Sequence, residues 1–379
     1  MEQEINVISI SHLFLPHVGG VETFAYNLLS FLVSKPHIKT TAIFCSSENY
    51  TRQENGILKM SIRAKMLFGG LYPFVTLKFF FTVLKFFLKT KNKVVIINGR
   101  HFTTSYIAFV LCVLMRINYI YIDSGFQPNI FKSGGANKLM AFLDKFVFGS
   151  IVFKAKAVVA ISEYTKNILI NLHPKIKDRV IVINTGFNSD KVSKYDITKK
   201  EKTISFISRI SIVKDPETVA KAYEILSTKY PNWKFQLIGK GDFEIKPGDY
   251  SYPSNVSVQN RLLPQEEVFS LLSTSSIFIN SSLSEGFSLA NQEASALGNV
   301  GVFSNAESNI EMAKTLGIDN LVFERKNIVD LVNKVSEAIK LCEKTNFKLN
   351  QEVSTKAFEK LSDKVLFEQY YTLVTTFRK

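Results

Sequence analysis

The sequence predicts an α/β protein with two parallel-sheet domains of the Rossmann-like type, and two observations support this prediction. Apolar runs typical of buried strands alternate with stretches of helical periodicity, and this alternation begins near residues 5–10 and begins again near 203–207. The length of 379 residues also favours two domains over a single core. We therefore expect an N-terminal domain over residues 1–187, a polar, lysine-rich linker over 188–202 and a C-terminal domain over 203–365.

The first strand, residues 5–10, precedes a helix expected over residues 21–33, where apolar side chains recur at helical spacing. Gly19 and Gly20 stand between these two elements. Glycines at a strand-to-helix turn allow a ligand to approach the backbone closely, although a plain tight turn uses the same residues. Both interpretations of the glycine pair remain open at this point.

Residues 76–89 are rich in phenylalanine, and a narrow polar stripe formed by Lys78, Thr82, Lys85 and Lys89 follows one side of the expected helix. Lysines inside a membrane span are costly, so we exclude a spanning helix. Two alternatives remain for this segment. It is either packed within the N-terminal domain or placed in a lipid interface with its lysines near anionic headgroups.

The next strand is expected at residues 94–98, and His101 follows it. A lone histidine at such a place is either structural or part of a site. The five histidines have no metal-ligand spacing, and the sequence contains no Asp-x-Asp run, so no metal is predicted.

The strand at 203–207 ends in a loop that carries Arg209 and Lys214, and Pro216 then starts a helix. Arginine presents a planar fork to phosphate oxygens, and lysine presents a point charge. The two side chains together could offset the charge of a leaving nucleoside diphosphate. The alternative is that both are solvated.

Residues 281–298 form a polar turn that leads into a small-residue helix, and apolar runs at 277–280 and 299–303 flank it. This order is strand, loop, helix, strand, which places the loop where ligands of parallel sheets bind. A helix that begins near Ser288 would direct the amides of its first turn toward an anion. The sequence therefore predicts a phosphate site at the amides of Gly286, Phe287, Ser288 and Leu289.

This stretch carries two carboxylates, Glu285 in the loop and Glu293 in the helix. They are separated by on the order of 8 Å along the helix axis, which leaves space for a diphosphate. Carboxylates accept hydrogen bonds from vicinal hydroxyls, so the pair could hold a sugar and a ribose. Alternatively, Glu285 caps the helix and Glu293 is a solvated helix residue.

The net charge of +14 is concentrated in the first half of the chain, which has 22 Lys and Arg against 9 Asp and Glu up to residue 187. A basic half suits nucleic acid, an anionic membrane or an acidic substrate. No zinc knuckle, RRM-type motif or DNA-reading helix is present, so nucleic acid is not expected. The acidic start and three unpaired cysteines, Cys45, Cys112 and Cys342, indicate a cytoplasmic protein with free thiols.

The pattern Glu-Gly-Phe-x5-Glu-Ala-x-Ala-x-Gly that starts at Glu285 resembles the signature of retaining glycosyltransferases of family 4, which have the two-domain GT-B fold. Three other stretches agree with this family in order along the chain: residues 16–22, 208–215 and 237–242. The resemblance covers nearly the whole sequence. It implies that the last segment, 366–379, forms a helix that crosses back to the N-terminal domain.

The resemblance also implies roles for the candidate residues. Arg209 and Lys214 would stabilise the departing diphosphate, and no cofactor or metal would be needed. Glu285 would hold sugar hydroxyls, and Glu293 would hold the ribose. His101 would lie near the donor sugar, and the turn at Gly19 and Gly20 would close over the donor diphosphate and the acceptor.

The sequence and this resemblance together predict a retaining glycosyltransferase that uses a nucleoside diphosphate sugar. Its acceptor would be a glycan or a lipid-linked compound in the synthesis of cell-surface polysaccharide or lipopolysaccharide. The basic N-terminal half favours a peripheral position on the inner face of the cell membrane. The alternatives are a nucleoside diphosphate sugar epimerase of the same fold and a non-catalytic glycan-binding homologue.

Overall fold

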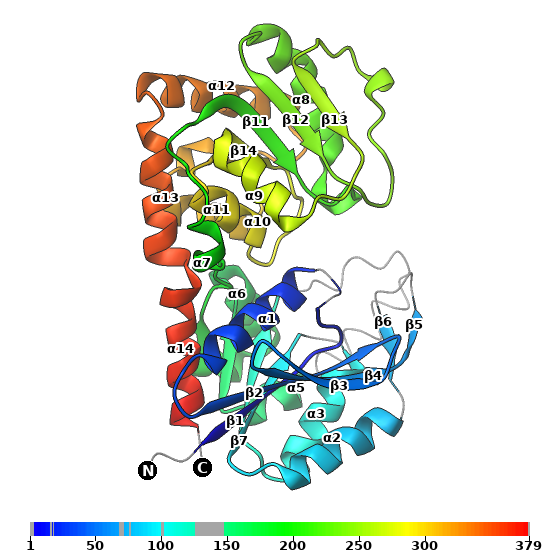
Figure 1. Cartoon of the computed structure of the whole chain (residues 1–379). Coiled ribbons are helices and arrows are strands. Elements are labelled where there is room, and N and C mark those ends of the chain that lie inside the picture. Colours follow the sequence, from blue (N-terminus) through cyan, green and yellow to red (C-terminus); the bar gives the residue numbers. More distant parts are fainter. Residues whose placement is uncertain are drawn as a thin grey trace. The chain divides into compact units, whose positions relative to one another are not determined.

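The computed structural model describes residues 4–15, 17, 19–67, 72–75, 77–99, 102–125 and 148–377. The chain divides into two compact units (Figure 1). The first unit comprises Met1–Gly186 and Asp363–Lys379, and the second comprises Phe187–Ser362. Each unit is an α/β layer structure with its own sheet, as the two rounds of strand and helix in the sequence predict.

The sheet of the first unit has the order β10-β9-β8-β7-β1-β2-β4-β3. All neighbours pair in parallel except β3 and β4. Its inner strands are runs of Val, Ile and Tyr buried on both faces, which is the composition expected of a covered parallel sheet. The strands are β1 (Ile5–Ile10), β2 (Ile38–Ser46), β3 (Tyr50–Glu54), β4 (Ile57–Arg63), β7 (Lys93–Asn98), β8 (Tyr119–Asp123), β9 (Ala157–Ala160) and β10 (Val180–Val182), with β5 (Lys65–Leu67) and β6 (Tyr72–Phe74) paired separately.

Helices cover this sheet, and the last of them comes from the end of the chain. In α14 (Asp363–Thr376), the rings of Phe367 and Tyr370 contact the ring of Phe24 in α1 (Gly20–Val33) at steep angles, with centroids 5.9 and 5.8 Å away. The predicted return of the C-terminal helix to the first domain is therefore confirmed. The helices are α1 (Gly20–Val33), α2 (Leu77–Lys89), α3 (Thr103–Leu114), α5 (Gly149–Lys154), α6 (Glu163–Leu172), η3 (Pro174–Arg179) and α14 (Asp363–Thr376).

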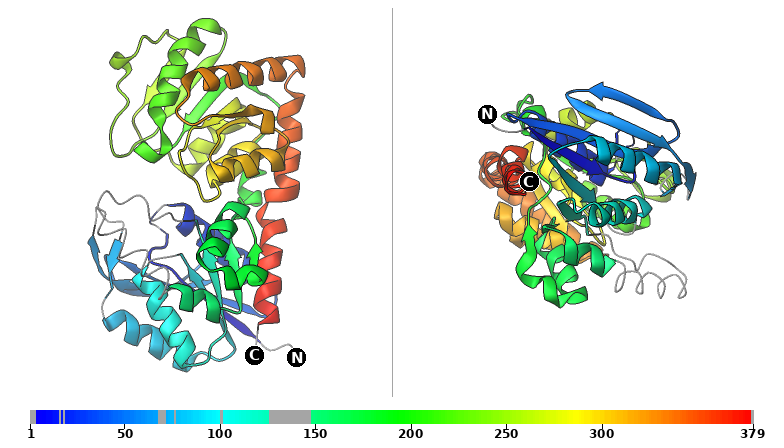
Figure 2. Two further views of the ribbon diagram at one scale, coloured as in Figure 1. Left: turned by 180° about the vertical axis from the view of Figure 1, so that it is seen from behind. Right: turned by 90° about the horizontal axis from the view of Figure 1, so that it is seen from below.

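The phenylalanine-rich segment forms α2, which packs beside α3 (Figure 2). Phe79, Val83 and Phe87 enter the core, so one side of the helix is packed within the unit. Phe81 and Leu88 remain exposed on the other side, next to the predicted lysine stripe. In the described part of the chain, no helix combines the length and the apolar character needed to span a bilayer.

The sheet of the second unit has the order β13-β12-β11-β14-β15-β16 and is parallel throughout. Its strands are β11 (Glu201–Ile207), β12 (Lys234–Ile238), β13 (Val256–Gln259), β14 (Ser275–Asn280), β15 (Val300–Ser304) and β16 (Val322–Phe323). Its helices are α7 (Ser189–Val192), η4 (Ile212–Lys214), α8 (Pro216–Lys229), η5 (Pro247–Asp249), α9 (Gln265–Thr274), α10 (Leu289–Ala296), α11 (Glu307–Leu316), η6 (Asp319–Leu321), α12 (Ile328–Lys344) and α13 (Lys348–Leu361).

The polar segment 188–202, predicted as an interdomain linker, belongs instead to the second unit. The side chain of Asn188 caps α7, and β11 already begins at Glu201. Lys200 donates hydrogen bonds to four backbone carbonyl groups at the ends of α9 and α10, those of Leu272, Ser273, Ser275 and Leu297. The segment lacks apolar periodicity because it forms only one short helix and the start of a strand, and most of its polar side chains are exposed while Lys200 completes helix ends.

The three cysteines are buried and form no disulfide, as predicted. Cys45 and Cys112 lie in the first unit, and Cys342 lies in the second. Burial raises the pKa of each thiol above its usual value, which disfavours the reactive thiolate.

The strand order of each sheet reverses at one place, between β1 and β7 in the first unit and between β11 and β14 in the second. Loops that leave the carboxyl ends of two such strands diverge, and ligands of open α/β sheets bind between them. The residues that follow β11 and β14 are those of the predicted phosphate site. The fold therefore brings the loop that carries Arg209 and Lys214 and the loop that carries Glu285 to the same edge of the sheet.

Candidate active site

The loops after β11 and β14 lie side by side and are joined by hydrogen bonds. The amide of Leu283 donates to the carbonyl oxygen of Val213 at 2.8 Å. The hydroxyl of Ser281 donates to the carbonyl oxygens of Lys214 and Asp215 at 2.7 and 2.9 Å. These bonds fix the backbone that carries Lys214 against the loop that carries Glu285.

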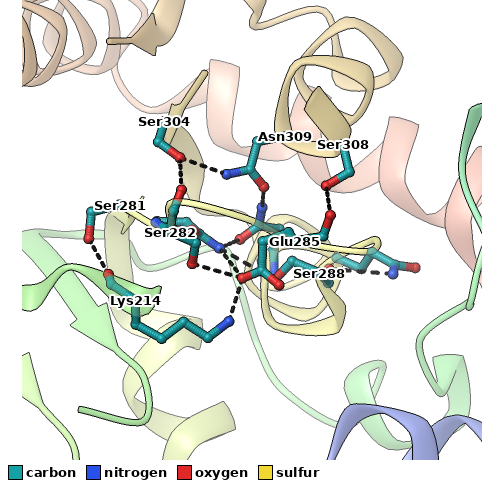
Figure 3. Close-up of polar contacts among 11 residues, drawn as sticks. Lys214, Ser281, Ser282, Glu285, Ser288, Ser304, Ser308 and Asn309 are labelled. Carbon is teal, nitrogen blue, oxygen red and sulfur yellow. Dashed lines mark hydrogen bonds and ion pairs between the residues drawn. The ribbon is translucent and has the colours of Figure 1, made fainter. Parts of the chain in front are cut away.

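Lys214 and Glu285 form an ion pair at the centre of this arrangement (Figure 3). The same carboxylate oxygen accepts a hydrogen bond from the hydroxyl of Ser282 at 2.8 Å, and Asn280 approaches it at 3.5 Å. The side chain of Glu285 is only 12% exposed, whereas that of Lys214 is 28% exposed. The sequence placed both residues in the site, but it did not predict that they contact each other.

A buried network of serine and asparagine side chains supports the loop that carries Glu285 (Figure 3). Asn280 donates to Asn291, Asn291 donates to Asn309, and Asn309 donates to Ser304, at 2.6, 3.0 and 3.1 Å. Ser304 in turn donates to the carbonyl oxygen of Ser282 at 2.6 Å. The sequence analysis missed this network, although Asn280 and Ser304 at the ends of β14 and β15, and the asparagines in the helices that follow, were a signal for it.

Helix α10 begins at Leu289 with Ser288 as its N-cap, which agrees with the helix start predicted near Ser288. The hydroxyl of Ser288 accepts a hydrogen bond from the amide of Asn291, and the ring of Phe287 is buried. In the described part of the chain, no acceptor is bonded to the amides of residues 286–289. The donor capacity of these four amides, at and just before the start of α10, is therefore unused, which suits an anion.

Arg209, on the same loop after β11, pairs with Asp242 at 2.8 Å and not with Glu285. Its side chain is 55% exposed. The backbone around it is fixed, because the amide of Ile210 donates to the carbonyl oxygen of Lys240 and the amide of Asp242 donates to that of Ile210. The structure thus separates the two predicted cations into two ion pairs with different acids.

Glu293 is half-buried, which excludes the alternative of a solvated helix residue. Gln265 donates to its carboxylate at 3.3 Å, and Lys191 donates to the side-chain oxygen of Gln265 at 3.1 Å. Burial raises the pKa of Glu293 to about 7. No sequence pattern pointed to Lys191 or Gln265, because they come from two other helices.

Two family models match this chain and together span most of it. The model described as Glycosyltransferase Family 4 matches residues 18–191, and the model described as Glycosyl transferases group 1 matches residues 188–360. The chain is a glycosyltransferase of this family. The resemblance of the Glu285 stretch and its companion motifs is thereby confirmed, and the protein is an enzyme of the glycosyl-transferring class.

Characterised relatives of this glycosyltransferase are distant in sequence. The N,N'-diacetylbacillosaminyl-diphospho-undecaprenol alpha-1,3-N-acetylgalactosaminyltransferase of Campylobacter jejuni is 23% identical over 343 residues, which cover 85% of this chain and 88% of the relative. A component of the phosphatidylinositol N-acetylglucosaminyltransferase of Arabidopsis thaliana is 22% identical over 354 residues, covering 89% and 75% respectively.

Solved structures confirm the GT-B fold of this glycosyltransferase. Anabaena Alr3699/HepE, crystallised with UDP and glucose, superposes with a TM-score of 0.71 at 14% identity, covering 98% of this chain and all of the other. An E. coli trehalose-6-phosphate protein bound with UDP-2-fluoro glucose superposes with a TM-score of 0.72 at 11% identity, covering 97% and 98%. At these identities the likeness concerns the fold alone.

In the first unit of this glycosyltransferase, Gly19 and Gly20 stand where predicted, between β1 and α1. Gly20 is the first residue of α1, and Gly19 is its N-cap with an extended backbone. Glu22, in the first turn of the helix, folds back toward Gly19. His101, predicted near the donor sugar, lies outside the described residues.

The raised pKa of Glu293 predicts a stability difference that depends on pH. Because the folded state keeps this carboxyl protonated to a higher pH, its contribution is fully present below the usual pKa of 4.5 and is lost as the pH rises through about 7. Relative to Glu293→Gln, the wild type should therefore lose roughly 1 to 3 kcal/mol of unfolding free energy between pH 4.5 and 8. Urea unfolding across this range measures it, with Glu266→Gln at an exposed position of α9 as the control. A difference that stays constant with pH contradicts the prediction.

Proposed function

We propose that this protein transfers a sugar from a nucleoside diphosphate sugar to a hydroxyl group, with retention of anomeric configuration. The observation that carries the proposal is the position of Lys214 beside Glu285, on the loop that leads to the unused amides of α10. A cation and unused amides at the start of a helix suit a diphosphate, and a partly buried carboxylate suits sugar hydroxyls. The solved structures with UDP and UDP-glucose support a nucleotide-sugar donor.

In the proposed reaction, the bond between the anomeric carbon and the diphosphate oxygen breaks while the acceptor oxygen bonds to the same carbon on the same face. Negative charge grows on the leaving diphosphate, where Lys214, Arg209 and the amides from Gly286 onward would stabilise it. The departing phosphate oxygen takes the acceptor proton, so no separate base is required. Glu285 would hold donor-sugar hydroxyls, and Glu293 would accept from the ribose. His101 remains a candidate for a contact with the donor sugar.

The acceptor is proposed to be lipid-linked or a glycan of the cell surface. The Campylobacter relative is named for an undecaprenol diphosphate-linked acceptor, and the Arabidopsis relative is named for phosphatidylinositol. Both acceptors place the sugar to be extended next to a bilayer. We therefore propose a peripheral position on the inner face of the cell membrane, in the synthesis of polysaccharide or lipopolysaccharide.

The proposed function is tested by incubating the protein with a panel of nucleotide sugars and a bacterial membrane extract. The expected result is release of nucleoside diphosphate together with a labelled product that requires the extract. A changed donor sugar without an acceptor would identify an epimerase instead. Absence of both products with every donor would support a non-catalytic glycan-binding protein.

The outer side of α2 supports the membrane position and makes it testable. At 100° per residue, Leu77, Phe81 and Leu88 form one apolar stripe, and the exposed lysines form a stripe directly beside it. Leu88 is 68% exposed, which is unusual for a leucine on a helix otherwise packed in a core. An apolar stripe beside lysines suits the interface of an anionic bilayer.

Replacing Phe81 and Leu88 by serine is expected to weaken binding to vesicles that contain anionic phospholipid by at least about tenfold. Each replacement removes apolar surface that would be buried in the bilayer interface. Added salt should weaken the wild type as well, since it screens the lysines. Leu262→Ser is the matched control, because Leu262 is a similarly exposed leucine of the second unit. Vesicle sedimentation measures binding, and equal binding to neutral vesicles would refute the assignment.

A further inference from the structure

An arginine that no motif of the sequence indicated, Arg325, links the loops that follow β14, β15 and β16. It lies two residues after β16, and Nη1 of its guanidinium group donates to the carbonyl oxygen of Leu283 at 2.8 Å. Leu283 belongs to the loop that carries Glu285. The Nε atom donates to the side-chain oxygen of Asn305, directly after β15, at 3.1 Å. The three strands are neighbours in the sheet, so this one side chain spans their carboxyl ends.

The guanidinium group of Arg325 is held in a fixed orientation. The side-chain oxygen of Asn305 accepts from both the backbone amide and Nε of Arg325, each at 3.1 Å. The amide of Asn305 in turn donates to the carbonyl oxygen of Phe323 at 2.7 Å, and Nη2 of Arg325 lies 3.9 Å from the carboxylate of Glu307. A planar group with acceptors in two loops fixes the position of one loop relative to the other more closely than a point charge does.

The turn that carries Arg325 is fixed without the help of the arginine side chain. Asn327 caps α12, and the carboxylate of Asp330 in the first turn of that helix accepts from the amide of Glu324 at 2.7 Å. The residue after the arginine, Lys326, has φ of 62°, a left-handed backbone that lysine rarely adopts. Such a conformation persists only where the surrounding structure imposes it. Removal of the Arg325 side chain should therefore leave the turn in place.

The bond to Leu283 matters for the candidate active site, because the backbone of this residue is held on both sides. Its amide donates to the carbonyl oxygen of Val213, next to Lys214. In the described part of the chain, its carbonyl oxygen accepts from Arg325 alone. Glu285 follows two residues later, so the Leu283 backbone sets the place from which its carboxylate enters the site. Loss of the arginine bond frees one side of this backbone.

We propose that Arg325 is a positioning residue for sugar transfer. Its guanidinium group holds the loop that carries Glu285 from the β16 side, so that the carboxylate meets the hydroxyl groups of the donor sugar. It acts through the backbone of Leu283 and makes no contact with the substrate. This inference rests on the proposed glycosyl transfer, and it adds to that function a residue outside the loops after β11 and β14.

The first test is Arg325→Ala, with the nucleotide sugar that the transfer assay identifies as the donor. Single-turnover transfer at saturating donor is expected to fall about tenfold to a hundredfold, because a displacement of about 1 Å at the reacting groups has an effect of this size. The double variant with Glu285→Gln should lose no more than Glu285→Gln alone, since Arg325 acts through this carboxylate. The dissociation constant of the released nucleoside diphosphate should stay within about threefold.

Lys326→Met is the matched control for Arg325→Ala. It removes an exposed cation from the same turn, and methionine meets the same backbone strain as lysine does. Its rate of transfer should stay within about twofold of the wild-type rate, because the change is confined to the surface.

The second test is rescue of Arg325→Ala by free guanidinium ion, at a concentration far below that which unfolds the protein. The wild-type side chain is 36% exposed, so a small ion can reach the space that it leaves. Guanidinium can donate to both acceptors and should raise transfer by at least about threefold, whereas the same concentration of sodium chloride should not. Guanidinium lowers the stability of folded proteins, so a gain in rate cannot come from general stabilisation.

Arg325→Lys is the variant to use if thermal melting shows that Arg325→Ala is not folded. Lysine keeps the charge but lacks the planar fork that bonds Leu283 and Asn305 together. Transfer should therefore still fall by at least about threefold.

The outcomes separate the role of Arg325 from the function on which it rests. With normal wild-type transfer, full activity of Arg325→Ala or Arg325→Lys overturns the positioning role alone. Losses that add fully to those of Glu285→Gln also overturn it, because the arginine would then act independently of that carboxylate. A loss of nucleoside diphosphate affinity as large as the loss of rate overturns it as well, since Arg325 would then bind the diphosphate. Absence of transfer by the wild type with every donor overturns the proposed function and this role together.

Discussion

Lys214→Met is expected to lower the rate of sugar transfer by about a hundredfold to ten-thousandfold without unfolding the protein. The leaving diphosphate gains charge as its bond breaks, and a fixed cation acts most strongly where charge develops. Lys214 is fixed, because its carbonyl oxygen is bonded to Ser281 and its ammonium group is bonded to Glu285. Single-turnover release of nucleoside diphosphate at saturating donor measures the effect on the chemical step.

The same substitution should also lower the unfolding free energy by about 1 to 3 kcal/mol, because it leaves the 12% exposed carboxylate of Glu285 without its cation. Adding Glu285→Gln should restore much of this stability but none of the activity. Lys221→Met is the control, since Lys221 is an exposed lysine of α8 in the same unit. If Lys214→Met transfers sugar within about threefold of the wild-type rate, Lys214 has no role in stabilising the leaving group.

Gly241→Ala is expected to lower the unfolding free energy of the second unit by about 2 to 4 kcal/mol, because a Cβ atom there would overlap the backbone of Ile210. The obstacle is a main-chain carbonyl group and not a flexible side chain. Relief of the overlap therefore has to move the loop after β11. Denaturant unfolding measures the change, and binding of the nucleoside diphosphate of the proposed donor should weaken with it, because Arg209 and Asp242 are paired across the same contact.

Gly248→Ala is the matched control for this substitution. No atom lies within 4 Å of the position that its Cβ would occupy, so it should leave stability and nucleoside diphosphate binding unchanged. Equal stability of Gly241→Ala and Gly248→Ala would contradict the close packing of the two loops. Gly239→Ala should destabilise the second unit for the same reason as Gly241→Ala, because a Cβ atom there would overlap the carbonyl oxygen of Ser208.

Local signals in the sequence predicted the parts of the fold that depend on local structure. The spacing of apolar residues predicted α1, and the sequence around Ser288 predicted the start of α10, because periodicity and capping act within one helix. The polarity of residues 188–202 wrongly predicted a linker, because the contacts of this segment are distant in the sequence. Lys200 binds carbonyl groups that are more than seventy positions away.

The candidate site shows the same division between local and distant contacts. Glu285 was identified from its own motif, but its pairing with Lys214 depends on two strands that are adjacent only in the sheet. The glycines at 239 and 241 belong to a stretch that agrees with the family in sequence, and the structure shows that they allow two loops to pack. No single-sequence pattern distinguishes these uses of glycine, because both require a missing side chain.

The placement of the cysteines gives each unit an internal chemical reporter. Cys45 and Cys112 are shielded by the core of the first unit, and Cys342 is shielded by that of the second. A thiol-directed alkylating reagent reaches a buried sulfur only when the surrounding structure opens. The rate at which each cysteine is modified, resolved by peptide mass spectrometry, therefore reports the opening of one unit separately from the other, without any engineered label.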